Sequence, residues 1–177
     1  MDRCEACAFL FDDLAPSSVA AAMLRLSGEY EQRLAPGATL GPDVEHDLRL
    51  RAHPLSGVWS ALEYACHVRD VLRVQRERVQ QALHEDRPAV APMGREERVE
   101  RDRYNEQVPA TVAIELRAAA TSFADDLDAL DAAGWARPAL YNWPTHQERT
   151  VTWIARHTVH EMEHHLRDID DVLATAS

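Results

Sequence analysis

The chain has 177 residues, of which 46% are hydrophobic and 28% charged, a composition ordinary for a soluble globular protein. Its net charge of −11 argues against nucleic acid and anionic membranes as partners, and no apolar run approaches the ~20 residues of a membrane span. Length and composition therefore predict one domain over residues 1–177.

The N-terminus carries a Cys-x-x-Cys pair, Cys4 and Cys7, after a polar start that does not resemble a signal peptide. A structural zinc site needs two more ligands, and the sequence has no second Cys-x-x-Cys motif to supply them. The favoured interpretation is a pair of reduced thiols, with redox chemistry or partial metal binding as alternatives. Three cysteines, an odd number, argue against a disulfide framework and favour a cytoplasmic protein.

Helical periodicity predicts a first helix over residues 16–34 and a second from residue 60 to about residue 84. A polar connection up to about Ser56 separates them. Ser60 and Glu63 have the spacing of a capping box, which explains Glu63 better than a role as a metal ligand. His67 lies at the edge of the apolar face of the second helix, where a lone histidine is usually a core or boundary residue.

Residues 86–103 form a connection too long for a tight hairpin, which indicates a crossover in a helical bundle. A third helix is predicted over residues 109–130. The aromatic loop at residues 135–144 could wall a pocket or cover the end of the core. The pattern predicts an all-α fold, a four-helix bundle with a long crossover between its second and third helices.

The last predicted helix, residues 151–174, holds most of the candidate chemistry. Thr150 is a plausible N-cap, although Thr145 has the capping-box spacing and could start the helix earlier. Four of the nine histidines lie within residues 157–165, together with two glutamates. Such a density of imidazole and carboxylate groups is typical of a metal site.

Two pairs in this helix have the i, i+4 spacing that places both members on one face: His160 with His164, and Glu161 with His165. On a helical wheel that starts at Val151, the apolar stripe centres near zero. Glu161 and His165 then lie on its flank, at roughly 280° and 320°, and the other pair lies nearly opposite, at roughly 180° and 220°. Bundle metal sites are built from side chains that project inward. The wheel therefore favours Glu161 and His165, with His160 and His164 as the alternative pair.

Two segments resemble the signatures of the DinB-like superfamily. Trp59-Ser-Ala-Leu-Glu-Tyr-Ala-Cys-His67 places a tryptophan eight residues before a histidine, and the segment from His160 to Ile169 contains a histidine, His165, followed by an aliphatic residue. The resemblance implies a YfiT-like four-helix bundle that holds a divalent metal with His67, Glu161 and His165. Many relatives have histidine at the position of Glu161, whereas the mycothiol-dependent maleylpyruvate isomerase branch is similar to this chain in using His, Glu and His.

The resemblance implies a metal-dependent enzyme, with zinc expected and nickel or iron as alternatives. Two imidazoles and one carboxylate leave an open position, as in catalytic zinc sites. We expect a thiol S-transferase or isomerase that activates mycothiol, a similar thiol or water for transfer, isomerisation or hydrolysis of a small electrophile. The all-arginine set of 19 basic residues is typical of a GC-rich genome, which agrees with mycothiol. Arg156 or Arg167 could pair with a substrate carboxylate, and His160 or His164 could orient a ligand or transfer a proton.

Two other hypotheses remain open from the sequence. A metal-stabilised bundle could act as a non-catalytic binding or stress-related protein, as a single chain or as a homodimer, and this predicts a closed four-ligand site without a pocket. Alternatively, His160 to His164 reads as the His-Glu-x-x-His of a metalloprotease, with Glu161 as general base. Too few residues follow His164 for the usual third ligand of that motif. A bundle without any metal is the remaining alternative.

Overall fold

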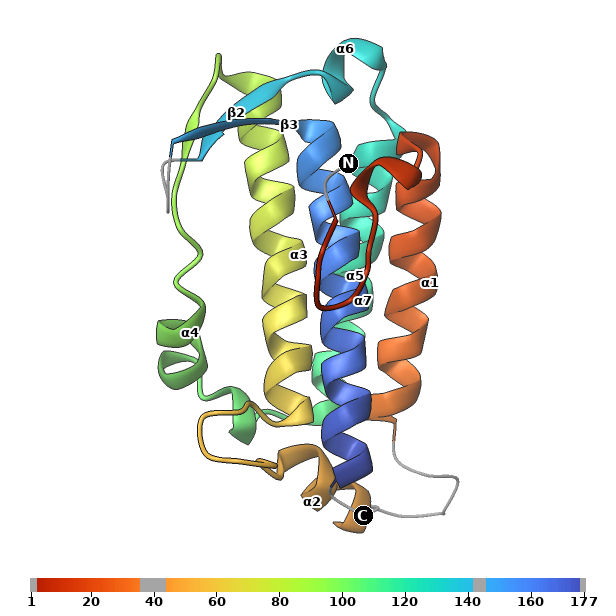
Figure 1. Cartoon of the computed structure of the whole chain (residues 1–177), viewed down its shortest axis with the longest axis vertical. Coiled ribbons are helices and arrows are strands. Elements are labelled where there is room, and N and C mark those ends of the chain that lie inside the picture. Colours follow the sequence, from red (N-terminus) through yellow and green to blue (C-terminus); the bar gives the residue numbers. More distant parts are fainter. Residues whose placement is uncertain (1–2, 36–43, 142–145, 176–177) are drawn as a thin grey trace.

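The computed structural model describes residues 3–35, 44–141 and 146–175. Four long helices form a bundle: α1 (Pro16–Leu34), α3 (Ala61–His84), α5 (Pro109–Asp128) and α7 (Val151–Thr175). Helix α1 packs against α5 and α7, and α3 packs against the same two helices, so consecutive helices α1 and α3 lie diagonally across the bundle (Figure 1). The predicted four-helix bundle is confirmed. No helix in the described ranges is long and apolar enough to cross a membrane.

The predicted long crossover joins α3 to α5. Figure 1 shows this link returning along the outside of α3 to the other end of the bundle, so α3 and α5 run parallel and a short turn cannot connect them. The link contains three short elements, and the α5–α7 link contains three more. They are β1 (Ala89–Val90), α4 (Arg95–Arg101) and the 3₁₀ turn η2 (Tyr104–Glu106), then α6 (Ala132–Trp135), β2 (Pro138–Tyr141) and β3 (Gln147–Thr150).

A three-stranded sheet, in the order β1-β2-β3, ties the two links together. Strand β1 pairs parallel with β2, with Val90 opposite Tyr141, and β2 pairs antiparallel with β3, with Pro138 opposite Thr150. The sequence analysis assigned the residues of β1 and β2 to loops and did not predict β3. Strands of two to four residues are too short to show a period of two, so the tertiary contacts define them.

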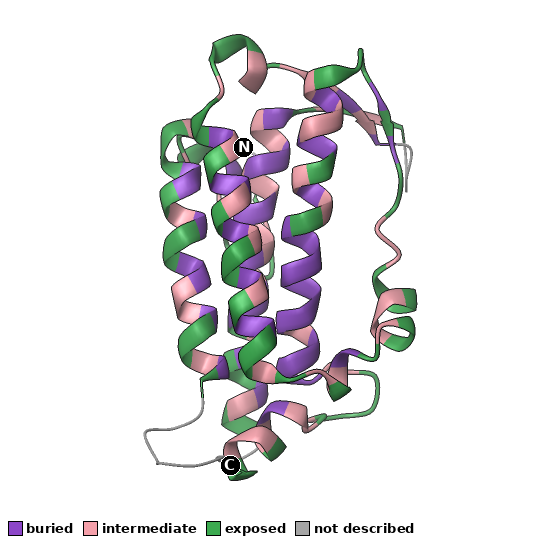
Figure 2. Ribbon diagram, turned by 180° about the vertical axis from the view of Figure 1, so that it is seen from behind, coloured by how far each residue is buried: buried purple, intermediate pink, exposed green. Residues whose placement is uncertain are grey.

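The core lies along the bundle axis, and buried side chains line the inner faces of the helices (Figure 2). Tyr30, Leu116, Phe123 and Met162 are fully buried. The Tyr30 hydroxyl donates to the carbonyl of Met162, at 2.8 Å, so its one polar group is satisfied inside the core. Truncating Phe123 to alanine would cost about 3–5 kcal/mol, because the helices can close only part of the cavity.

The N-terminal ends of α3 and α7 have the caps that their sequences predict. The Ser60 hydroxyl accepts from the backbone N–H of Glu63 at 3.1 Å, and the Glu63 carboxylate accepts from the N–H of Ser60 at 2.8 Å. This reciprocal pair confirms the capping box. The N–H of Trp153 donates to the Thr150 hydroxyl at 3.3 Å, which confirms Thr150 as the cap of α7. An earlier start is wrong, since β3 occupies the preceding residues; Thr145 itself lies outside the described residues.

The polar connection before residue 56 contains a helix, α2 (Val44–Arg51), which the sequence analysis did not predict. Its eight residues lack an apolar face, so periodicity gives no signal. Hydrogen bonds to the ends of the bundle hold it: His46 contacts the carbonyl of Arg33 at 3.0 Å, and Arg49 donates to the carbonyl of Leu173 at 2.8 Å. The 3₁₀ turn η1 (Phe11–Asp13) before α1 was likewise not predicted.

Candidate metal centre

Helices α3 and α7 bring His67, Glu161 and His165 together inside the bundle. One ligand atom of each lies within 4.8 Å of the others. Oε2 of Glu161 is 3.9 Å from Nε2 of His67 and 3.5 Å from Nε2 of His165. Both histidines are buried, and the i, i+4 spacing on α7 directs Glu161 and His165 to the face that packs on α3. The two α7 residues that the wheel favoured therefore meet His67.

Burial and mutual contacts decide the charge of these groups. Burial lowers the pKa of His67, and Glu161 offsets this only in part. Burial also lowers the pKa of His165, but hydrogen bonds to Asp168 and Glu161 outweigh it and raise that pKa to about 9. For Glu161, burial raises the pKa, yet contacts with three histidines outweigh it and hold the carboxyl well below its usual range. The carboxylate is thus ionised and surrounded by imidazoles.

Asp168 orients the ring of His165. Nδ1 of His165 lies 2.7 Å from Oδ2 of Asp168, so Nδ1–H donates to the carboxylate and Nε2 faces Glu161. A carboxylate that fixes the tautomer of a histidine in this way is the usual support of a metal ligand. Asp168 is one turn further along α7, which makes its contact with His165 an i, i+3 pair.

Aromatic rings enclose the two histidines. Trp59 packs on His67 with ring centroids 5.1 Å apart, which explains the tryptophan eight residues before it. Tyr64 stacks on His165 at 5.3 Å, and Trp59 and Tyr64 contact each other at the start of α3 as a hydrophobic staple. These walls restrict water and fix both rings without using their Nε2 atoms.

The donor set fits a divalent metal. Nε2 of His67 and Nε2 of His165 both lie next to Oε2 of Glu161, so three donor atoms converge on one point. Two imidazoles and one carboxylate form the ligand set of catalytic zinc sites such as His₂Glu, with metal–ligand distances of about 2.0–2.2 Å, and binding would displace the proton that His165 carries near neutral pH. The separations of 3.5 and 3.9 Å exceed those expected between ligand atoms around zinc by at most about 1 Å, so small side-chain rotations would suffice.

A pocket of about 460 Å³ opens beside the triad, and His67 and Glu161 form part of its wall. The extended residues before α4, the sheet and the helices α3 and α7 enclose it. Three arginines line it against the single carboxylate of Glu161, so this pocket is cationic in a chain of net charge −11. These arginines are Arg78, Arg95 and Arg149. The other wall residues are Val71, Val74, Gln75, Pro92, Met93, Gly94, Tyr141, Gln147, Trp153 and His157.

The sequence analysis missed the pocket arginines Arg78 and Arg149. Arg78 donates to Gln75 at 3.1 Å and to the carbonyl of Ala91 at 2.6 Å. Arg149 lies over the ring of Trp153 at 4.6 Å, donates to Gln147 at 2.6 Å, and keeps a buried Nε without a partner among the described residues. No sequence signal marks either arginine, because Arg78 lines a pocket only where the crossover lies beside α3, and strand β3 places Arg149.

The two arginines proposed from the sequence have other contacts. Arg156 donates to the carbonyl of Leu14 at 2.8 Å, and Arg167 donates to the carbonyl of Cys7 at 2.6 Å. Neither lines the pocket. Both hold the N-terminal segment against α7, so the idea that one of them pairs with a substrate in this pocket is not supported by their positions.

The alternative pair, His160 and His164, does not join the triad. These side chains lie on the neighbouring face of α7, where the N-terminal segment covers them, and group with Cys4 and Cys7. The His-Glu-x-x-His segment is therefore divided: its glutamate faces His67 and His165, and its histidines face the two thiols. This division does not match a metalloprotease, whose motif needs both histidines on one metal.

Comparisons with known proteins agree with this geometry. The family model of the DinB superfamily matches residues 46–169. YfiT from Bacillus subtilis, described as a probable metal-dependent hydrolase with an unusual four-helix bundle topology, has a similar structure, with a TM-score of 0.77 at 15% identity over 89% of this chain and 85% of its own.

A second similar structure is that of the mycothiol-dependent maleylpyruvate isomerase, with a TM-score of 0.68 at 15% identity. The alignment covers 91% of this chain and 63% of the isomerase. At such low identity both likenesses show the fold alone. No curated protein sequence matches this chain.

Proposed function

This chain belongs to the DinB superfamily, and from that premise we propose that it is a divalent-metal-dependent enzyme acting on a small, anionic electrophile. His67, Glu161 and His165 would hold the metal, which is zinc by donor type, with nickel or iron as alternatives. The observation that carries the proposal is the cationic pocket beside a three-ligand set. A metal at these ligands would supply Lewis-acid chemistry and would lower the pKa of a thiol or of water at its open position.

The chain's own residues then bind and orient the substrate. Arg149 and Arg95 lie in the pocket wall, where a carboxylate can accept charge-assisted hydrogen bonds from a guanidinium. Trp153 offers an aromatic face, and His157 stacks on it at 4.7 Å. Nδ1 of His157 contacts Gln75 at 3.3 Å, which fixes the ring at the edge of the pocket, where it can accept a proton released from a nucleophile.

Two nucleophiles, water and a low-molecular-weight thiol, are suggested by the two similar structures. YfiT is described as a probable hydrolase, and the isomerase depends on mycothiol. For this chain we propose a low-molecular-weight thiol, mycothiol or a similar one, as the nucleophile in transfer or isomerisation. Water in a hydrolysis is the alternative. The pocket of about 460 Å³ has room for a small electrophile, with part of the thiol extending outside.

The non-catalytic alternative predicts a closed site with four protein ligands and no pocket. The triad has three ligands and a pocket beside it, which favours catalysis there.

The test compares turnover of the zinc-loaded wild type with that of His67→Ala. Carboxylate-bearing electrophiles, maleylpyruvate among them, would be offered with mycothiol, with glutathione and with water alone. We expect turnover with one of these three nucleophiles and loss of that turnover in His67→Ala, while circular dichroism shows that the helices of the variant persist. Wild-type turnover in a metal-free His67→Ala protein would refute the proposal. A metal-loaded wild type without turnover with any of the three nucleophiles would favour the non-catalytic alternative.

A further inference from the structure

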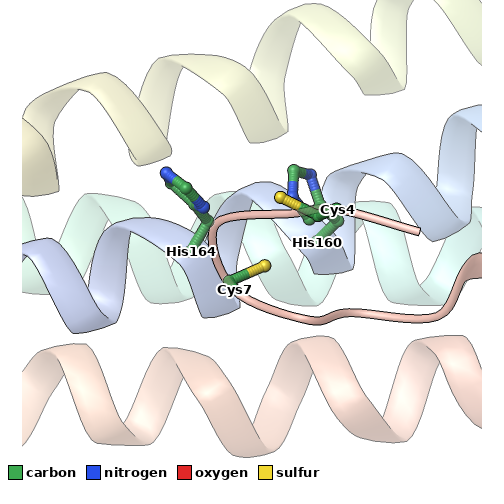
Figure 3. A group of neighbouring side chains, drawn as sticks. All are labelled: Cys4, Cys7, His160 and His164. Atoms are coloured by element: carbon green, nitrogen blue, oxygen red, sulfur yellow. The ribbon is translucent and has the colours of Figure 1, made fainter.

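A second group of metal-binding side chains lies on the neighbouring face of α7. Cys4, Cys7, His160 and His164 each offer one ligand atom, and the four atoms lie within 4.8 Å of one another. Figure 3 shows the N-terminal loop lying along α7, with the thiol of Cys4 against the ring of His160. This group shares no residue with the triad of His67, Glu161 and His165.

The arrangement follows from the sequence of α7. Two i, i+4 pairs are offset by one residue, and one residue rotates a helix by about 100°. Glu161 and His165 therefore face α3, while His160 and His164 face the N-terminal loop. The two faces meet at Glu161, whose Oε1 is 3.3 Å from Nδ1 of His160.

The two histidines have buried ring nitrogens that lack partners. Among the described residues, neither ring nitrogen of His160 makes a hydrogen bond, and Nδ1 of His164 makes none; the 3.3 Å approach of His160 to Glu161 does not have hydrogen-bond geometry. Buried polar atoms without partners are rare in native proteins and call for a missing ligand or water. Here the missing ligand would lie beside two thiols.

The loop is folded in a way that presents both thiols. The N–H of Ala8 donates to the carbonyl of Cys4 at 2.9 Å, and the N–H of Cys4 donates to the carbonyl of Phe9 at 3.0 Å. Ala8 has a φ of +62°, a left-handed conformation that costs a non-glycine residue free energy. Arg167 binds the carbonyl of Cys7, and Phe11 packs on His160 with ring centroids 5.2 Å apart. A strained turn held at four points indicates a built site.

We propose that Cys4, Cys7, His160 and His164 bind a second divalent metal, zinc, in a closed tetrahedral site. Two sulfurs and two nitrogens are the Cys₂His₂ set of structural zinc sites, and Cys-x-x-Cys has the ligand spacing of such sites. Zinc–sulfur and zinc–nitrogen distances of about 2.3 and 2.0 Å place neighbouring ligand atoms about 3.3–3.8 Å apart. The four atoms therefore need to approach one another by no more than about 1.5 Å.

Binding would release the proton of each thiol and would join the N-terminal loop to α7. Four protein ligands leave no open position, so this metal would be structural, in contrast to the metal of the triad. Since His160 also contacts Glu161, the second metal would restrain the residue next to the triad.

Cobalt(II) distinguishes the two sites, because only the second contains sulfur. Cobalt bound by thiolate absorbs in the near ultraviolet by ligand-to-metal charge transfer, and a tetrahedral site absorbs strongly in the visible. We expect the charge-transfer band in the cobalt-loaded wild type, its loss when Cys4 and Cys7 are both serine, and its retention in His67→Ala. The matched control is Cys66→Ala, since Cys66 is buried in the core and belongs to neither group.

Absence of the charge-transfer band from the wild type, or its persistence when Cys4 and Cys7 are both serine, would overturn the proposal. A second measurement uses the wild type alone, so it does not depend on the folding of a variant. Alkylation of Cys4, which is partly exposed, should be fast after chelation of the metal and at least tenfold slower with zinc bound. Equal rates would overturn the proposal as well. If the triad does not bind metal, the charge-transfer band and the slow alkylation of Cys4 would still be observed, so the two proposals can fail separately.

Discussion

Asp168 provides a sharp test of the triad because it contacts the proposed metal only through His165. Its carboxylate accepts a hydrogen bond from Nδ1 of His165 at 2.7 Å, and its side chain is 31% exposed. Replacing it with asparagine keeps the size and removes the charge. A hydrogen bond to a charged group is worth about 1.5–3 kcal/mol. Loss of a carboxylate behind a metal-binding histidine lowers metal affinity about 10–100-fold, or about 1.4–2.8 kcal/mol. The two ranges agree.

The assay is competition for zinc with a chelator of known affinity. Asp168 also lies 3.8 Å from Nε2 of His164, so the titration would use a background in which Cys4 and Cys7 are serine and only the triad binds metal. Asp170→Asn is the matched control. It is on the same helix, but its carboxylate pairs with Arg33 at 2.6 Å, away from the triad. Unchanged affinity in Asp168→Asn, or an equal loss in Asp170→Asn, would refute the reasoning.

Three further predictions concern binding and stability. In the pocket, Arg149→Gln should raise KM for a carboxylate substrate about tenfold or more, as measured by steady-state kinetics, while the surface variant Arg117→Gln should leave it unchanged. Ser60→Ala should lower the free energy of unfolding by about 1 kcal/mol in a urea titration, because a capping-box bond is lost; no change would contradict this. Burial raises the pKa of Asp70, but hydrogen bonds from Arg69 and Tyr104 outweigh burial and lower that pKa. The stability from Asp70 is then present above about pH 4 and lost as pH falls further, so Asp70→Asn should be about 3 kcal/mol less stable at pH 7 and approach the wild type in acid.

The four bundle helices could be predicted because each buries one continuous stripe. Residues 16–34, 60–84 and 109–128 repeat apolar side chains at the helical period, and proline or a capping box marks each start. Part of the triad followed from the same stripe, since the wheel places Glu161 and His165 at its flank. The resemblance to the DinB-like signatures, and not the periodicity, implied His67 as the third ligand.

Helix α2 and the pocket could not be predicted, because they depend on tertiary contacts that a local sequence pattern does not show. Helix α2 has no apolar face, and hydrogen bonds to the ends of α1 and α7 hold it. The pocket depends on the crossover and β3 lying beside α3, which brings Arg149 to the same cavity as Arg78 although the two residues are far apart in the sequence.

The cysteine–histidine cluster shows the limit most clearly. Sequence analysis considered zinc at Cys4 and Cys7 and set it aside, since no second Cys-x-x-Cys was present. The remaining candidates were already known, as His160 and His164 were named as an alternative pair. More than 150 residues separate the two halves, and only the fold of the N-terminal loop on α7 joins them.

The central claim is that His67, Glu161 and His165 bind a metal. The most direct test is elemental analysis of untagged protein in which Cys4 and Cys7 are serine, after incubation with zinc and removal of free metal. We predict one equivalent in this background, none after the further change His67→Ala, and one after His46→Ala, which alters a histidine outside both groups. One equivalent retained without His67, or no metal in the background protein, would contradict the account.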